Sequence, residues 1–264
     1  MSMESYVDRM VRRFELEQTK SATTPMENGF KLEAEDIGEV GYDEMISEYR
    51  SLIGSIGDCC IALRYDCLVA FSILSRYLAE PYPTLIKAAK RVIQSLRYTR
   101  DFKITWTITA SDIIHKSQNI LFGAVDASFA MDEINHRSHM GFINFMDHGA
   151  VSWRSRQQPV ATMSSAEAEY IAFASEIQEI KYLRQLLKDL GHEQMEPTLI
   201  YEDNLAWIML ASNESKSAGR CKNVHIKFRF TAEAILATEV RIRDIPTDFK
   251  FADLLTKPLV LATF

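Results

Sequence analysis

Apolar residues in the first hundred positions recur every three to four residues, which is the spacing of helices that bury one face. The recurrence predicts four helices, over residues 6–14, 45–56, 68–78 and 83–96. A break falls after the first of them, because Pro25 forces the residue before it out of the helical conformation. The first hundred residues are therefore expected to form a small all-helical unit.

The pattern changes near residue 103. Residues 104–108 alternate apolar and polar side chains, as a half-buried strand does, and residues 111–117 are expected to form a junction. Five further runs are typical of strands: 120–125, 139–146, 150–155, 198–201 and 240–245. Residues 147–149 fit the turn of a hairpin between two of these strands.

Helical patterns separate and follow these strands. Ser164 is a suitable N-cap for a long helix that ends before Gly191. Further helices are expected over residues 205–211, 224–237 and 248–255. The order of the elements predicts an α/β fold in which helices pack on a mixed sheet.

The composition is that of an ordinary globular protein. The chain has 264 residues, of which 47% are apolar and 25% are charged. These values exclude a disordered, collagen-like or disulfide-stapled chain. Domains commonly have about 150 residues, so the length predicts two domains of modest size. We place them at residues 1–110 and 118–264.

Signals for metal-binding cysteines, membranes and secretion are sparse. The four cysteines form no C-x-x-C pair, which argues against a structural zinc site and is typical of reduced thiols inside a cell. The longest apolar run, residues 67–75, is far shorter than the roughly 20 residues of a membrane helix. The N-terminus lacks the apolar segment of a secretory signal. We therefore expect an intracellular chain without a membrane partner.

Charge is distributed unevenly. The formal net charge of −6 argues weakly against a nucleic-acid partner. Residues 81–110 nevertheless carry six basic residues and one acid, and residues 215–230 carry five basic residues and no acid. Such segments either follow a phosphate backbone or form solvated helix faces, and the composition alone does not separate the two.

Four acidic residues occupy positions at which side chains converge in a mixed sheet. They lie at the ends of two strands, in the first turns of the long helix and in the last helix: Asp126, Asp203, Glu169 and Asp253. Taken singly, each is more simply explained as a solvated helix acid, an N-cap or a surface residue. Together they match a metal-dependent phosphodiesterase, which needs clustered carboxylates for two hard cations about 3.5–4 Å apart.

Five segments carry a resemblance to a known family, namely residues 123–130, 149–158, 164–172, 201–204 and 251–259. In this order they resemble the ribonuclease H domain at the C-terminal end of copia-type LTR-retrotransposon Pol polyproteins. The sequence Ser-Ser-Ala-Glu-Ala-Glu-Tyr-Ile-Ala and the terminal Ala-Asp-Leu-Leu-Thr-Lys-Pro-Leu are particularly specific. Earlier segments are similar to the thumb or connection segment that joins the polymerase to that domain: residues 6–14, 24–26, 49–55 and 87–93.

The resemblance implies a fold and a reaction. The fold is a ribonuclease H-like mixed five-stranded sheet with flanking helices, preceded by a small all-helical thumb or connection unit. The reaction is hydrolysis of the RNA strand of RNA–DNA hybrids with two Mg²⁺ or Mn²⁺ ions. The implied ligands are Asp126, Glu169, Asp203 and Asp253. The resemblance also decides between Glu167 and Glu169, which point to different sides of the helix.

Recognition of a hybrid would rest on phosphate contacts, 2′-hydroxyl contacts and groove shape. The candidate nucleic-acid contacts are Arg154, Arg156, Lys222, Lys227, Lys90 and Arg97. The implied partners are the hybrid and the upstream polymerase domain of the same polyprotein. The implied location is a retroelement particle in the cytoplasm, or the nucleus.

One departure from the family leaves alternatives open. The polymerase palm is missing from the chain, and Tyr6-Val-Asp-Arg9 only superficially resembles the polymerase signature Tyr-x-Asp-Asp. We therefore expect no DNA synthesis by this chain alone. A catalytically silent nucleic-acid-binding remnant, or a subunit that scaffolds a partner polymerase, remains an alternative to the nuclease. The four acids favour the nuclease.

Overall fold

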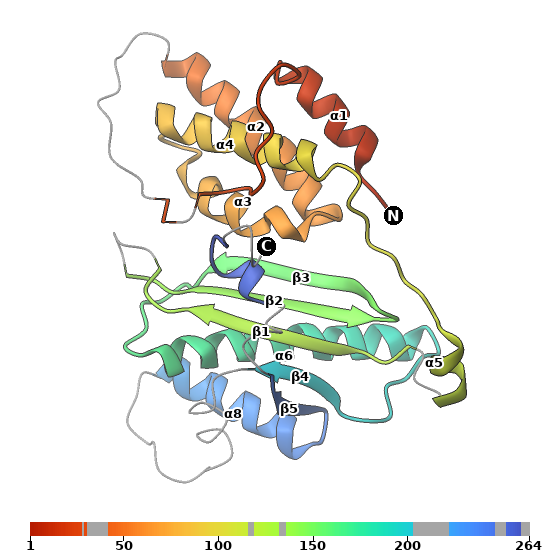
Figure 1. Ribbon diagram of the computed structural model, residues 1–264. Helices are drawn as coiled ribbons and strands as arrows, with labels where there is room; N and C mark the ends of the chain where they lie inside the picture. The colour runs from red at the N-terminus through yellow and green to blue at the C-terminus, as the bar shows by residue number, and fades with distance from the viewer. Residues whose placement is uncertain are drawn as a thin grey trace. The chain divides into compact units, whose positions relative to one another are not determined.

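A computed structural model describes residues 1–27, 29–30, 42–115, 119–131, 136–202, 222–245 and 252–259. The chain divides into two compact units (Figure 1). The first is Met1–Ile104 together with Lys257–Phe264, and the second is Thr105–Thr256. The N-terminal stretch of the helical unit therefore ends a few residues before residue 110, where the sequence pattern placed the end of the helical domain.

The first unit is helical, as expected. Its helices are α1 (Glu4–Arg13), α2 (Tyr42–Ala62), α3 (Leu68–Leu74) and α4 (Pro83–Tyr98), with short 3₁₀ turns at η1 (Tyr65–Cys67) and η2 (Ser75–Tyr77). The apolar residues of α4 recur every three to four positions, so they lie on one face of the helix. This face is buried against α1 and α2. The buried hydroxyl of Tyr49 donates to the carbonyl of Leu74 at 2.7 Å and fastens α2 to α3.

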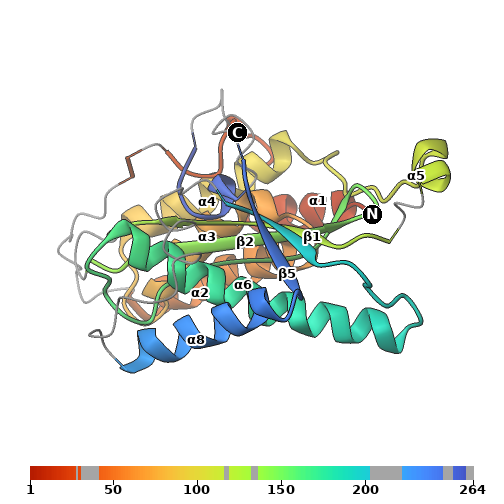
Figure 2. The same ribbon diagram turned by 90° about the horizontal axis from the view of Figure 1, so that it is seen from below.

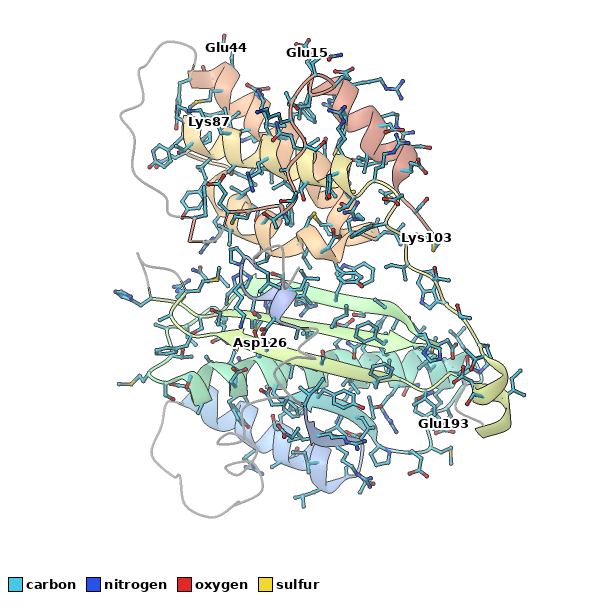
Figure 3. The ribbon with its side chains drawn as sticks, in the orientation of Figure 1. Glu15, Glu44, Lys87, Lys103, Asp126 and Glu193 are labelled. Carbon is cyan, nitrogen blue, oxygen red and sulfur yellow. The ribbon has the colours of Figure 1, made fainter. Side chains whose placement is uncertain are left out.

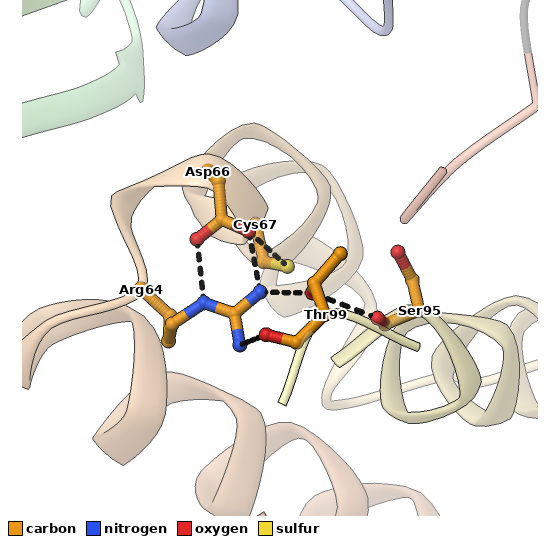
Figure 4. Close-up of polar contacts among 5 residues, drawn as sticks. All are labelled: Arg64, Asp66, Cys67, Ser95 and Thr99. Carbon is orange, nitrogen blue, oxygen red and sulfur yellow. Dashed lines mark hydrogen bonds and ion pairs between the residues drawn. The ribbon is translucent and has the colours of Figure 1, made fainter. Parts of the chain in front are cut away.

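A buried charge pair fixes the connection between α2 and α3 to the end of α4 (Figure 4). The side chain of Arg64 donates to both carboxylate oxygens of Asp66, at 2.9 and 2.6 Å. It also donates to the carbonyl of Thr99 at 3.1 Å and to the Thr99 hydroxyl. Arg64 is only 2% exposed, so its charge depends on these partners.

Removal of the Arg64 charge pair should destabilise the helical unit. We expect Arg64→Met to lower the free energy of unfolding by about 3 kcal/mol, because it leaves the partly buried Asp66 carboxylate beside an uncharged side chain. Arg100 is a matched control, since its ion pairs with Glu4 and Asp8 are exposed and should contribute less than about 1 kcal/mol. Urea unfolding of both variants measures the difference. Equal losses for Arg64→Met and Arg100→Met would contradict the prediction.

The second unit contains the expected mixed five-stranded sheet, in the order β3-β2-β1-β4-β5. Its strands are β1 (Phe122–Ser128), β2 (His139–Met146), β3 (Gly149–Gln157), β4 (Thr198–Glu202) and β5 (Val240–Asp244). The first three pair in antiparallel fashion, and β1, β4 and β5 pair in parallel. Asp147 and His148 form the turn between β2 and β3, both with positive φ, as a two-residue hairpin requires.

Two helices, α6 (Ser165–Asp189) and α8 (Lys222–Leu236), cover the same face of the sheet (Figure 2). Alternate residues of the strands point toward α6 and form the core with it, including Val125, Phe142 and Ile200. The core side of α6 contributes Phe173 and Ile177. None of the helices in the described ranges is long and apolar enough to span a bilayer.

Two expectations for residues 104–117 are wrong. Residues 104–108 form no strand of the sheet, because the alternating pattern has no partner strand to pair with. Instead, the Thr107 amide donates once to the Asp147 carbonyl, at 2.9 Å. The expected junction contains a short helix, α5 (Ala110–His115), which begins where Thr109 and Asp112 bond reciprocally to each other's backbone amides.

The expected last helix is shorter than predicted. Of residues 248–255, the structure describes a single 3₁₀ turn, η4 (Asp253–Leu255), and the part before Ala252 lies outside the described residues. The helix expected over residues 205–211 also lies outside them.

On the face of β1 that packs against α6, the fully buried carboxyl group of Glu176 occupies the space beside Gly123. An ideal Cβ on Gly123 would collide with the carboxyl of Glu176 in α6, and would lie 2.7 Å from Asn144 Oδ1. Only glycine therefore allows α6 to approach the strand this closely. Burial raises the pKa of Glu176 well above its usual range, and the Asn144 amide, which donates at 3.4 Å, offsets this only partly.

Glu176 should therefore make stability fall as pH rises. The folded state keeps the proton at pH values where the unfolded chain has lost it, so stability declines above the ordinary glutamate pKa, by at most about 1.4 kcal/mol per pH unit. We expect Glu176→Gln to flatten this decline between pH 5 and pH 8, as measured by thermal unfolding. Glu193→Gln, at an exposed position, is the control. An unchanged pH dependence in Glu176→Gln would contradict the assignment.

Candidate functional site

Asp126 lies near the end of β1 on the face of the sheet opposite α6 (Figure 3). Its neighbour Val125 points into the core with α6, so the alternation of the strand turns Asp126 to the other side. Asp126 is only 6% exposed. Across the strand pair it lies opposite Gly141 of β2.

The turn η4 covers Gly141 and reaches Asp126. An ideal Cβ on Gly141 would lie 2.5 Å from Leu255 Cβ and 2.9 Å from the Leu255 carbonyl oxygen, so only glycine admits the turn at this position. The next residue, Thr256, donates its hydroxyl hydrogen bond to Asp126 Oδ2. The same hydroxyl lies 3.2 Å from the Asp253 carbonyl oxygen. The structure therefore brings the turn that contains Asp253 next to Asp126.

Glu167 and Glu169 have different surroundings at the start of α6. The Glu167 carboxylate accepts from the Met163 amide at 2.8 Å, while the Glu167 amide donates to the Ser164 hydroxyl at 3.2 Å. This reciprocal pair is a capping box, and it commits Glu167 to the helix N-terminus. Glu169 lies two residues further along the helix and is 5% exposed.

The position of Glu169 along the sheet follows from Glu176. The two lie two turns apart on one stripe of α6, a separation of roughly 10.5 Å. Asp126 lies three residues beyond Gly123, which is roughly 10 Å along β1. The first turns of α6, which include Glu169, lie at the arrowhead end of β1 (Figure 1), toward which Asp126 also lies.

The fourth predicted acid, Asp203, lies outside the described residues; it follows Glu202, the last residue of β4. Among the residues that the structure describes, no three His, Cys, Asp or Glu side chains are grouped closely enough to hold a metal ion. The donor chemistry fits Mg²⁺ or Mn²⁺, which take oxygen ligands, because the acids at the end of β1 offer carboxylates only.

Three of the predicted nucleic-acid contacts influence one another. Arg154 and Arg156 are alternate residues of β3, so they share a face of the strand. Burial and then the charge of Arg154 lower the pKa of Arg156, and burial and then the charge of Arg156 lower the pKa of Lys227 in α8. Arg154 lies over the ring of Phe142 and 3.8 Å from Glu179. The three cations therefore form a local surplus of positive charge, which we call the β3–α8 cation group.

The other predicted contacts are placed differently. Lys222 begins α8, and its side chain lies outside the described part of the chain. Lys90 forms an ion pair with Glu48 at 2.7 Å. Arg97 donates to the carbonyls of Leu16 and Thr19 at 2.9 and 3.3 Å, and so it fastens the segment after α1 to α4. Lys90 and Arg97 therefore make internal contacts of the helical unit.

Thr256 and Gly141 were missed as site residues by sequence reasoning. Thr256 lies in a motif that carried the family resemblance, but periodicity does not connect a threonine near the C-terminus to a strand 130 positions earlier. A glycine in the middle of a buried strand was the available signal, because such a glycine often marks the close approach of another backbone.

No family model matches the chain, whereas individual relatives do. The chain is 29% identical to the retrovirus-related Pol polyprotein from transposon TNT 1-94 of Nicotiana tabacum, over 97% of this chain and 19% of that protein. It is 29% identical to the Pol polyprotein from transposon RE1 of Arabidopsis thaliana, over 100% of this chain and 17% of that protein. The chain thus spans less than a fifth of these relatives.

A shorter relative has a different name. The secreted RxLR effector protein 161 of Plasmopara viticola is 33% identical over 51% of this chain and 90% of that protein. Among solved structures, a foamy viral protease–reverse transcriptase with double-stranded DNA has a TM-score of 0.46 at 10% identity, over 79% of this chain and 35% of that chain. RNase H1 from Halobacterium salinarum has a TM-score of 0.37 at 14% identity, over 52% of this chain and 93% of that chain.

The order and pairing of the strands define the sheet unit as a ribonuclease H-like domain. Over nearly its whole length the chain is similar to copia-type retrotransposon Pol polyproteins, and it corresponds to a segment of them.

Proposed function

We propose that the chain is the ribonuclease H segment of a Pol polyprotein and hydrolyses the RNA strand of RNA–DNA hybrids. The observation that carries this proposal is the contact of Asp126 with the turn that contains Asp253, made through Thr256. This contact supports a site at one end of β1 to which both Asp126 and Asp253 would contribute. The capping role of Glu167 supports Glu169 as the acid contributed by α6.

The proposed metal ligands are Asp126, Glu169, Asp203 and Asp253. Two bound Mg²⁺ or Mn²⁺ ions would supply an activated water and stabilise the leaving oxygen. The contribution of the chain is to hold carboxylates where both ions are to bind. Burial of Asp126 and Glu169 strengthens their attraction for cations, because the surrounding protein screens charge less than water does.

The β3–α8 cation group is the proposed contact with the phosphates of the hybrid. Cations that repel one another are stabilised by a bound polyanion, and phosphate contacts position a duplex without reading its sequence. The proposed partners are the hybrid and an upstream polymerase domain of the same polyprotein. The proposed location is a retroelement particle in the cytoplasm, or the nucleus.

The alternative is a nucleic-acid-binding remnant without turnover. One observation favours it: the described acids do not gather into a group of three. The cation group would then serve binding alone.

The first test is cleavage of a labelled RNA–DNA hybrid in Mg²⁺ or Mn²⁺. We expect Asp126→Asn and Glu169→Gln each to lower the rate by more than about 100-fold, because even the partners of metal ligands contribute about 10- to 100-fold. Glu167→Gln is the matched control two residues away, and it should keep most of the activity because its role is to cap α6. Hybrid binding without cleavage by the wild-type chain would favour the remnant, and no binding would favour a scaffold.

The second test is the salt dependence of hybrid binding in EDTA, measured by fluorescence anisotropy. We expect Arg156→Gln to weaken binding and to reduce the slope of log K against log[salt] by about 1, because one phosphate contact is lost. Lys188→Gln is the control, since Lys188 is paired with Glu193 at 2.7 Å near the other end of α6. An equal effect of the two variants would exclude a specific role for the cation group.

A further inference from the structure

We propose that Thr256 is a positioning residue that holds the Asp126 carboxylate in the orientation needed to bind a metal ion. This role rests on the proposed function, since it concerns the first of the proposed ligands. Thr256 itself would touch neither ion nor substrate.

The surroundings of Thr256 show where its single hydroxyl proton goes. The residue is 0% exposed, and its hydroxyl oxygen lies between Asp126 Oδ2 and the Asp253 carbonyl oxygen. A hydroxyl donates one hydrogen bond, and a carboxylate is a stronger acceptor than a carbonyl. The proton therefore goes to Asp126.

This hydrogen bond limits a rotation that is otherwise soft. The terminal torsion of an aspartate side chain has a broad energy profile, so the packing of β1 alone does not set the plane of the carboxylate. A donor fixed on Oδ2 sets it. A β-branched residue is a suitable donor, because threonine has few χ1 rotamers and its hydroxyl direction follows the backbone.

The backbone of Thr256 is itself fixed against the sheet. Its amide donates to the Asp253 carbonyl at 3.1 Å, and the Leu255 amide donates to the Ala252 carbonyl at 2.9 Å. Leu255 and Ala252 are buried, and Leu255 occupies the space that a side chain at position 141 would need. The seating of Leu255 on Gly141 therefore determines where the Thr256 hydroxyl lies relative to Asp126.

The test compares Thr256→Val, which keeps the shape and removes the hydroxyl, with Thr256→Ser, which keeps the hydroxyl. The readout is the rise in Tm with Mn²⁺ concentration in the absence of nucleic acid, because a ligand that binds the folded state raises Tm. We expect Thr256→Val to require about 10- to 100-fold more Mn²⁺ for the same rise, and Thr256→Ser to follow the wild type.

A second variant tests the seating of the turn. In Gly141→Ala the added Cβ displaces Leu255, so we expect the same loss of Mn²⁺ response as in Thr256→Val although the hydroxyl is still present. Asp126→Asn marks the complete loss of this ligand.

The outcomes separate the two proposals. If Asp126→Asn weakens the Mn²⁺ response and Thr256→Val does not, the positioning role is overturned and the proposed function stands. The same conclusion follows if Thr256→Val lowers Tm in EDTA but leaves the Mn²⁺ dependence unchanged, because the role is then purely structural. If the wild type gives no response, or Asp126→Asn responds like the wild type, the proposed metal site fails and the role of Thr256 fails with it.

Discussion

The arrangement of the sheet unit depends on two glycines, which let other parts of the chain pack closely against the antiparallel strands β1 and β2. Gly123 of β1 admits the carboxyl of Glu176 from one face, and Gly141 of β2 admits Leu255 from the other. A side chain at either position would push away the element that packs there. The first approach sets the level of α6, and therefore of Glu169, along β1. The second sets the position of η4, and therefore of Asp253 and Thr256. Close packing at these two glycines thus positions the elements that carry two of the four proposed acids, Glu169 and Asp253.

Three carboxyl groups of the protein have different surroundings, and only one of these arrangements suits a metal ligand. Asp66 is bound through both of its oxygens by Arg64, which leaves no place for a cation. Burial raises the pKa of Glu176 and so favours its uncharged form, which does not attract a cation. Asp126 receives a hydroxyl donor, which stabilises negative charge without cancelling it. The kind of donor therefore distinguishes a candidate ligand from a structural carboxyl.

The parts of the fold that were predictable are those with a local signal. The stripe of α4 and the strands β1 to β5 follow from the periodicity of apolar residues, and Ser164 caps α6 as its type predicts. Residues 104–108 show the limit of this signal, since alternation predicts an extended chain but not a partner strand. Asp126 was predicted as a metal ligand because it lies at the end of a strand. Its bond to Thr256 was not, because nothing local connects residues so far apart. The basic segments likewise indicated candidate phosphate contacts, but they did not show which side chains bind other parts of the protein, as Lys90 and Arg97 do.

The described contacts around Asp126 join residues of one of the two compact units. Asp126, Glu169, Asp253 and Thr256 belong to Thr105–Thr256, and the glycines that position them do as well. The helical unit has its own core and its own buried charge pair at Arg64. Because the described contacts of the candidate site come from the sheet unit, a change at Gly141 or Thr256 would be stronger grounds for a silent site than a change in the helices.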